Sequence, residues 1–140
     1  VRAGQKEELD PCAAALSELA AGLAAGAETG LAPPYDARSV FAAARNGDAV
    51  ARAAVAEEAR RIALHIVPIA AVTDVGLVVL GGGIGANAEL LEAIRPLLAE
   101  WLAYPPRVEI SNLGDAAVLM GGLSVGLRSA LEQVFVSRRS

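Results

Sequence analysis

The spacing of apolar residues predicts three helices in the first half of the chain. The first begins at Asp10-Pro11, because an acidic N-cap followed by proline at the first helical position is a start signal. Glycines end it at Gly26 and Gly30. Its apolar stripe has helical spacing and consists of Leu16, Leu19 and Leu23.

Two aspartates mark the starts of the second and third helices. Residues 31–35 read LAPPY, which is not a helical sequence, and Asp36 then caps a short helix. Asp48 begins the longest helix, and Pro68 predicts a bend near its C-terminal end. We expect the short helix to bury Val40, Phe41 and Ala44. We expect the longest helix to pack on a sheet through Val55, Ile62, Ile66 and Ile69.

The central stretch of the chain combines a strand, a glycine turn and a helix start. Five of the six residues in 75–80 are apolar, which predicts a parallel strand buried on both faces. Gly81, Gly82 and Gly83 follow, and they allow a sharp turn that another group can approach closely. The helical pattern resumes after Asn87, which we interpret as a cap. Such a turn points backbone N–H groups toward a ligand, although a tight strand-to-helix connection is the alternative.

The last third of the chain predicts a helix, a strand and a final helix. The first helix runs from Asn87 to about Leu102, with a bend at Pro96, and the strand covers 107–111. Asp115 is expected to cap the final helix. Three glycines interrupt the apolar face of that helix, which indicates that something packs closely against it: Gly121, Gly122 and Gly126.

The predicted fold is therefore a helix-rich α/β arrangement in the order α-α-α-β-α-β-α. Two strands do not form a stable sheet alone, so we expect further strands from a missing N-terminal portion or from a partner chain. The 140 residues suit one domain, with residues 1–10 as an exposed lead-in. The chain starts at Val1 without an initiator methionine and its single methionine is Met120, so we expect a fragment of a longer protein.

Composition and charge exclude several classes of function. No apolar run approaches the roughly 20 residues of a membrane span. A net charge of −4 and a pI near 5.0 argue against nucleic-acid binding by these residues. One cysteine, Cys12, excludes an internal disulfide and favours the cytoplasm. Cys12 and His65 are isolated soft ligands, so we expect no metal site.

Three motifs in this order resemble the C-terminal part of the ROK family. They are the VFxxARxGD helix over 40–48, the strand ending in LGGGI over 80–84, and the LGxxAxLxG segment over 113–121. The family joins bacterial sugar kinases and sugar-responsive transcriptional repressors on an actin-like ATPase (ribonuclease H-like) fold. The resemblance covers residues 16–135, nearly the whole chain.

The resemblance implies a nucleotide site at the glycine turn. In the family this turn lies against the adenosine part of ATP, which implies nucleotide binding at Gly81, Gly82, Gly83, Ile84 and Asn87. The family's phosphate-binding DxGGT turn, its sugar-binding residues with the catalytic aspartate, and its zinc motif are not in this chain. We therefore expect no catalytic residue and no cofactor on the fragment itself, with ATP binding in the full-length protein.

Two functions remain open within the family. We favour the sugar-sensing and oligomerising section of a transcriptional regulator, because the last 23 residues of the resemblance, 113–135, look more like the regulators' final helix. Such a protein would bind a sugar or sugar phosphate effector through the missing portion, bind DNA through an upstream domain, and form a homo-oligomer. The alternative is the C-terminal half of an ATP-dependent, glucokinase-like sugar kinase.

A dinucleotide-binding module is a third candidate from another class. Gly81, Gly83 and Ala86 fit the pattern G-x-G-x-x-A after a strand, and Glu109 follows in the next strand. The three preceding helices have no role in that scheme, which disfavours it.

Overall fold

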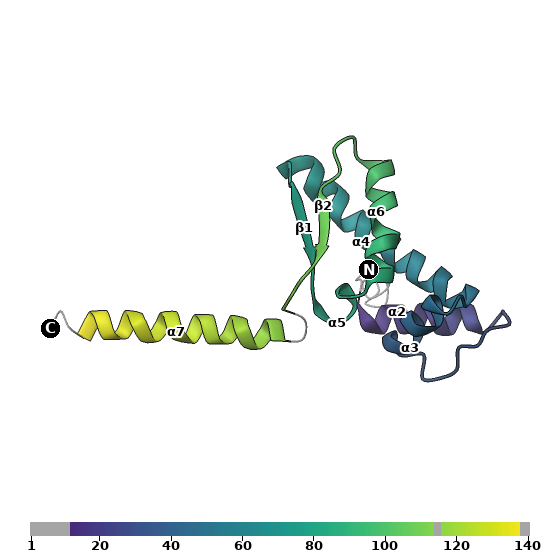
Figure 1. The fold of residues 1–140 in the computed structure, drawn as a ribbon, viewed down its shortest axis with the longest axis horizontal. Coiled ribbons are helices and arrows are strands. Elements are labelled where there is room, and N and C mark those ends of the chain that lie inside the picture. Colours follow the sequence, from purple (N-terminus) through teal and green to yellow (C-terminus); the bar gives the residue numbers. More distant parts are fainter. Residues whose placement is uncertain (1–11, 114–115, 138–140) are drawn as a thin grey trace, which may run out of the picture.

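The computed structural model describes residues 12–113 and 116–137 of the chain, and its elements follow the predicted order with one addition (Figure 1). Three helices precede the first strand, and the added four-residue helix α5 occupies the glycine turn. In chain order the elements are α2 (Ala13–Ala24), α3 (Ala37–Arg45), α4 (Ala49–Thr73), β1 (Leu77–Leu80), α5 (Gly82–Gly85), α6 (Ala88–Trp101), β2 (Arg107–Ile110) and α7 (Ala117–Ser137). The expected lead-in over 1–10 and the cap at Asp115 lie outside the described residues.

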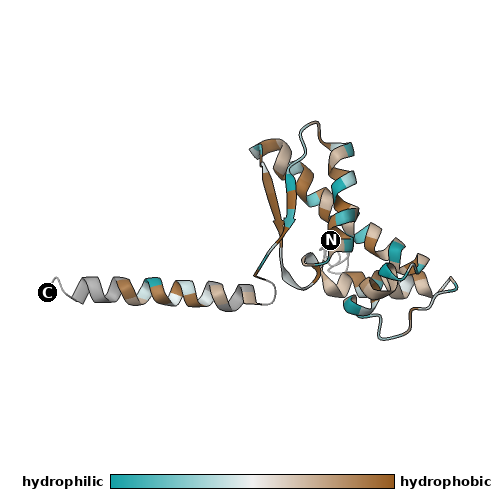
Figure 2. Cartoon of the chain, in the orientation of Figure 1, coloured by the Kyte–Doolittle hydropathy of each residue, from teal (hydrophilic) through white to brown (hydrophobic). Residues whose placement is uncertain are grey.

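The two strands pair in parallel, in a register that runs from Leu77 opposite Arg107 to Leu80 opposite Ile110. Helices α4 and α6 lie on one side of this pair (Figure 1). The prediction that β1 is buried on both faces is wrong for the described residues, because Leu77 is 43% exposed and Val79 is 55% exposed. No described element covers these apolar side chains, which give β1 its brown colour in Figure 2.

The core forms where α2, α3 and α6 pack around α4. The predicted burial of Leu16, Val40 and Phe41 is confirmed, and α6 contributes its own fully buried leucines and isoleucine. On α4 the expected face is only partly right, because Ile69 is 59% exposed. Small side chains occupy the centre of the α4 contact instead, which lets three helices approach it closely. They are Ala51, Ala54, Ala59 and Ala63.

Side chains at the helix starts fix where α2, α3 and α4 begin. Asp36 and Asp48 cap α3 and α4 as predicted, accepting hydrogen bonds from Ser39 N at 3.0 Å and Ala51 N at 2.8 Å. Helix α2 begins later than expected. Its N-cap is Cys12, whose Sγ accepts a hydrogen bond from the backbone N–H three residues on, and Asp10 is outside the described residues.

Helix α7 projects away from the rest of the chain (Figure 1). It exposes large apolar side chains, among them Leu123 and Val125. Within the described residues nothing lies within 4 Å of a Cβ built on Gly122 or Gly126, so the close packing expected there remains a prediction. In the described part of the chain no helix is both long and apolar enough to span a membrane.

Candidate functional site

The glycine turn after β1 owes its shape chiefly to Gly82. This residue has φ +78°, in the left-handed region that glycine adopts at little cost and other residues rarely adopt. Gly81 before it is extended, with φ −133°, and forms the N-cap of α5 without a side chain to contribute. The chain therefore leaves the strand, turns at Gly82 and makes one short helical turn before α6.

The other glycines of the turn have distinct roles. A Cβ on Gly85 would lie 3.2 Å from the backbone C of Leu80, so Gly85 lets α5 fold back onto the end of β1. A Cβ on Gly81 would meet only Ser111 Cβ, at an ordinary 3.7 Å. A Cβ on Gly83 would meet nothing within 4 Å among the described atoms. The only sequence signal of Gly85 is its place in the GGGIG run, so its role was not predicted.

An open cleft of about 490 Å³ lies between this turn and the N-terminal ends of α2 and α3. Four of the five predicted nucleotide-binding residues line it, and the fifth, Gly81, lies beside Ser111 instead. Residues 13, 36–38 and 41 form the opposite wall, and no sequence pattern indicated any of them as a ligand-binding residue. The lining consists of Ala13, Asp36, Ala37, Arg38, Phe41, Gly82, Gly83, Ile84, Ala86 and Asn87.

Asn87 holds the turn together in a way that differs from the predicted cap. It occupies the N-cap position of α6, but its side chain makes no capping hydrogen bond to that helix. Its Nδ2 instead donates to the carbonyl oxygen of Ile84 at 3.0 Å. The side chain therefore ties α5 to the start of α6 and fixes the glycine wall of the cleft.

The α3 wall carries one charge of each sign. Asp36 accepts hydrogen bonds from the hydroxyl and backbone N–H of Ser39, which lower the pKa of its carboxyl group and keep it ionised. Arg38 is exposed, and its guanidinium makes no hydrogen bond or ion pair with the residues that the structure describes. Among the described residues the rim of the cleft thus carries one charge of each sign, and the Arg38 guanidinium is available to contact a ligand.

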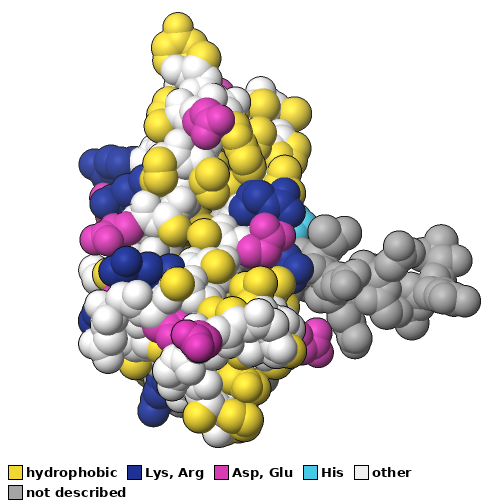
Figure 3. Space-filling model, turned by 90° about the vertical axis from the view of Figure 1, so that its right-hand side faces the viewer, with side chains coloured by type: hydrophobic (Ala, Val, Ile, Leu, Met, Phe, Trp, Pro, Cys, Tyr) yellow, Lys and Arg dark blue, Asp and Glu magenta, His cyan; other side chains and the backbone are white. Residues whose placement is uncertain are grey.

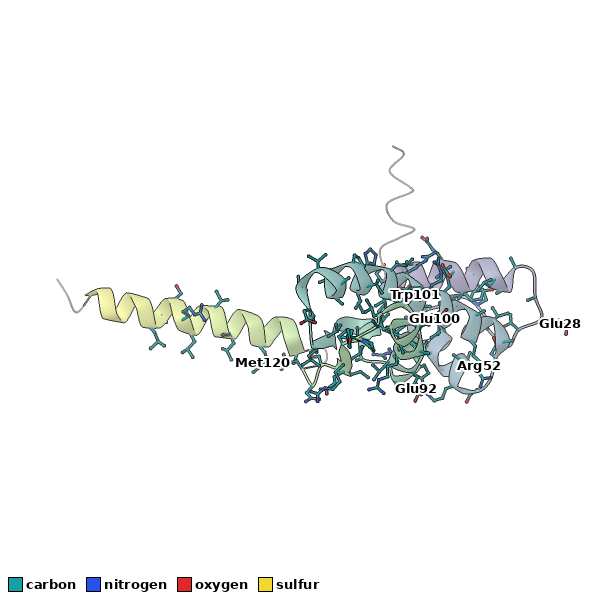
Figure 4. All side chains as sticks on the ribbon, turned by 90° about the horizontal axis from the view of Figure 1, so that it is seen from above. Glu28, Arg52, Glu92, Glu100, Trp101 and Met120 are labelled. Carbon is teal, nitrogen blue, oxygen red and sulfur yellow. The ribbon has the colours of Figure 1, made fainter. Side chains whose placement is uncertain are left out.

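A second hollow of about 350 Å³ lies between α3, α4 and α6, and the sequence analysis did not foresee it. Arg45 Nε donates to Glu89 Oε1 at its edge, and Arg52 Nε donates to the carbonyl oxygen of Ala44 at 3.1 Å. Arg52 and Glu92, labelled in Figure 4, come from α4 and α6 on one side of the molecule. One pair of charged groups here bind each other and Arg52 binds a backbone carbonyl, which suits a joint between helices.

Neither the charge on the face shown in Figure 3 nor the metal-ligand groups of the described residues suggest a further site. Acidic and basic side chains alternate on the face shown in Figure 3, and no broad basic patch gathers there. Over the residues that the structure describes, no three His, Cys, Asp or Glu side chains gather as a metal site.

Sequence comparison relates the chain to known proteins. The family model described as ROK family matches residues 13–127. The bifunctional enzyme NanE/NanK of Brucella melitensis is 33% identical over 87 residues, which cover 61% of this chain and 17% of that protein. The N-acetylmannosamine kinase of Salmonella typhi is 38% identical over 79 residues, covering 56% of this chain and 27% of the kinase. The chain thus spans well under half the length of these relatives.

Solved structures share the fold. A protein assigned as a sugar kinase from Cytophaga hutchinsonii matches with a TM-score of 0.72 at 23% identity, over 81% of this chain and 41% of its own. The ROK hexokinase from Thermus thermophilus matches with a TM-score of 0.57 at 32% identity, over 82% of this chain and 37% of the hexokinase. A ROK family transcriptional regulator, homologous to the E. coli MLC protein, matches with a TM-score of 0.60 at 20% identity, over 70% of this chain and 27% of the regulator.

Proposed function

The chain belongs to the ROK family, and from that premise we propose that it forms the nucleotide-binding C-terminal section of an ATP-dependent sugar kinase. The pattern of the final helix favours the regulator branch, with the kinase as the alternative, and the relatives in hand support that alternative better. The relatives cited above at 32–38% identity are a ROK hexokinase, an N-acetylmannosamine kinase and the bifunctional enzyme NanE/NanK. The regulator matches at 20% identity, which speaks for a shared fold alone.

The observation that carries this proposal is the cleft between the glycine turn and α3. Gly83 borders it with open space where a side chain would stand, so a flat ligand can approach the backbone there. Ile84 and Phe41 border the cleft as well, and because only 9% and 2% of their surfaces are exposed, each adds a small apolar area to its lining. A mostly apolar cleft with a few polar groups suits the nucleoside end of ATP.

The proposed role of this chain is to bind and orient the nucleotide. Orientation is a large part of phosphoryl-transfer catalysis, because the enzyme mainly positions reactants and stabilises charge. The sugar that accepts the phosphoryl group would be a hexose or N-acyl hexosamine, in line with the names of the relatives. Since the chain spans 17–41% of the proteins cited, the sugar and the catalytic base are proposed to bind outside the matched region.

Calorimetric titration of the purified protein tests the nucleotide site. We expect ATP, ADP and adenosine to bind, with NADH much weaker. Tight binding of NADH without binding of ATP would support the dinucleotide module instead and overturn our proposal.

A second experiment separates kinase from regulator. The protein expressed from the complete coding region is assayed for ADP release with glucose and with N-acetylmannosamine. ADP release that depends on one of these sugars supports the kinase. Sugar-sensitive binding to operator DNA without ADP release would show that the regulator interpretation is right.

A further inference from the structure

Arg38 stands out on the α3 wall of the cleft because nothing in the described chain engages it. It occupies the first turn of α3, across the cleft from Gly82 and Gly83. The other arginines near hollows of the structure are engaged. Arg45 pairs with Glu89, Arg52 binds the Ala44 carbonyl, and Arg95 Nη2 donates to the Val108 carbonyl at 3.1 Å.

The surroundings of Arg38 decide which part of a nucleotide it suits. The ionised Asp36 lies two residues before it on the same rim, so the two charges nearly cancel. A rim of that kind attracts phosphate groups only weakly. The nearly buried Phe41 and Ile84 border the same cleft with small apolar areas, and Gly83 leaves open space beside them in which a flat ring fits. A guanidinium group is itself planar and stacks well on aromatic rings.

We propose that Arg38 is the base-recognition residue of this cleft, with its guanidinium stacked on the purine ring of the bound nucleotide. The inference rests on the proposed nucleotide-binding function and adds to it a specificity-determining side chain. The glycine turn contacts the other side of the nucleoside through its backbone. Asp36 caps the start of α3 through its hydrogen bonds from Ser39.

Titration calorimetry with adenosine and ADP tests this assignment on the wild type and on Arg38→Ala, Arg38→Lys and Arg128→Ala. Arg128 is an exposed arginine on α7, far from the cleft, and serves as the matched control. Since cation–π contacts change affinity by about two- to thirtyfold, we expect Arg38→Ala to bind both ligands about tenfold more weakly. Arg38→Lys should lose nearly as much, because an ammonium group keeps the charge but not the plane.

Two results would overturn the assignment. If Arg38→Ala weakens only ADP and Arg38→Lys restores it, Arg38 binds phosphate and not the base. If Arg38→Ala binds both ligands as the wild type does, Arg38 makes no contact with the nucleotide. A wild-type protein that binds neither adenosine nor ADP contradicts the proposed function itself, and is thereby distinguished from a failure of the Arg38 assignment.

Discussion

Arg45 Nε lies 2.6 Å from Glu89 Oε1 and thereby joins the end of α3 to the first turn of α6. Helix α3 lines one wall of the cleft beside the glycine turn, and α6 begins directly after Asn87 in the other wall. The hydrogen bond from Arg45 lowers the pKa of Glu89, and Glu89 in turn raises the pKa of Arg45. The other oxygen of Glu89 is buried without a hydrogen-bond partner among the described residues, so the pair is the main polar link at this joint.

Breaking this pair should loosen the cleft more than it destabilises the fold. The Arg45 side chain is 62% exposed, so we expect Arg45→Gln or Glu89→Gln to lower Tm by only about 1–4 °C. Nucleotide affinity should fall severalfold, and the double variant should lose no more than either single one. Arg60→Gln, which breaks an exposed pair within α4, is the control and should leave nucleotide affinity unchanged. Additive losses in the double variant would contradict the coupling.

Local signals were visible in the sequence, whereas contacts between distant segments were not. Asp36 and Asp48 were predicted as caps because a cap depends on residues three positions away. The Arg45–Glu89 pair joins residues 44 positions apart, and no periodicity of either segment indicates it. The α3 wall of the cleft was missed for the same reason, since α3 and the glycine turn meet only in the folded chain.

Hydrophobic spacing also mistook which α4 side chains are buried. Large apolar residues such as Ile69 were predicted to be buried because of their spacing. Tight contacts between helices instead favour small residues such as Ala59. Exposed apolar residues on β1 are what we expect of a strand that belongs to a larger sheet, and the further strands stay a prediction. The Leu77 and Val79 side chains are exposed because no described element lies on that face.

Gly85 should be the structurally critical glycine of the turn. An alanine there would place Cβ 3.2 Å from the Leu80 backbone, where the strand end has little freedom to move. We expect Gly85→Ala to reduce the free energy of unfolding by about 1–3 kcal/mol, measured by urea denaturation. Gly83→Ala is the matched control, because its Cβ meets open space, and it should be no less stable than the wild type. Equal stability of the two variants would contradict these distinct roles.

Gly83 should instead be critical for the ligand. Gly83→Val adds a branched side chain to the cleft wall at a position where an added Cβ meets no described atom within 4 Å. We expect ATP and ADP affinity to fall by about tenfold or more, measured by calorimetry, with little change in Tm. Gly76→Val also has open space around its Cβ but lies outside this cleft, so it should retain wild-type affinity. If Gly83→Val binds ATP and ADP with wild-type affinity, the nucleotide does not contact this wall of the cleft.

Asp48 should make the fold sensitive to acid. Hydrogen bonds from Ala51 N, then Gly30 N and the Thr29 hydroxyl, lower its pKa below the ordinary value of 3.8. Its stabilising contribution is therefore fully present above about pH 4 and is lost as the pH falls through the lowered pKa. Asp48→Ala should lower Tm at pH 7 by about 5 °C, and the difference from the wild type should shrink below pH 4. A difference independent of pH would show that the charge is unimportant.

Glu58 should destabilise the fold at neutral pH. Its side chain is fully buried on α4, and neither carboxyl oxygen has a hydrogen-bond partner among the described residues. Burial raises its pKa above the ordinary 4.5, and the charge of Arg61 opposes this only in part. The folded state thus holds the proton more tightly than the unfolded chain, so stability falls as the pH rises from about 4.5 through the raised pKa.

Replacing Glu58 by an apolar residue of similar shape should reverse that loss. Glu58→Met should be more stable than the wild type at pH 7 by about 1 kcal/mol or more, and its stability should vary less between pH 5 and pH 8 in urea denaturation. The neighbouring Glu57 is partly exposed and paired with Arg60, so Glu57→Met should change stability little and keep the wild-type pH dependence. A Glu58→Met protein less stable than the wild type at pH 7 would show instead that the buried carboxylate is satisfied in solution, most directly by the N–H of Cys12 at the start of α2.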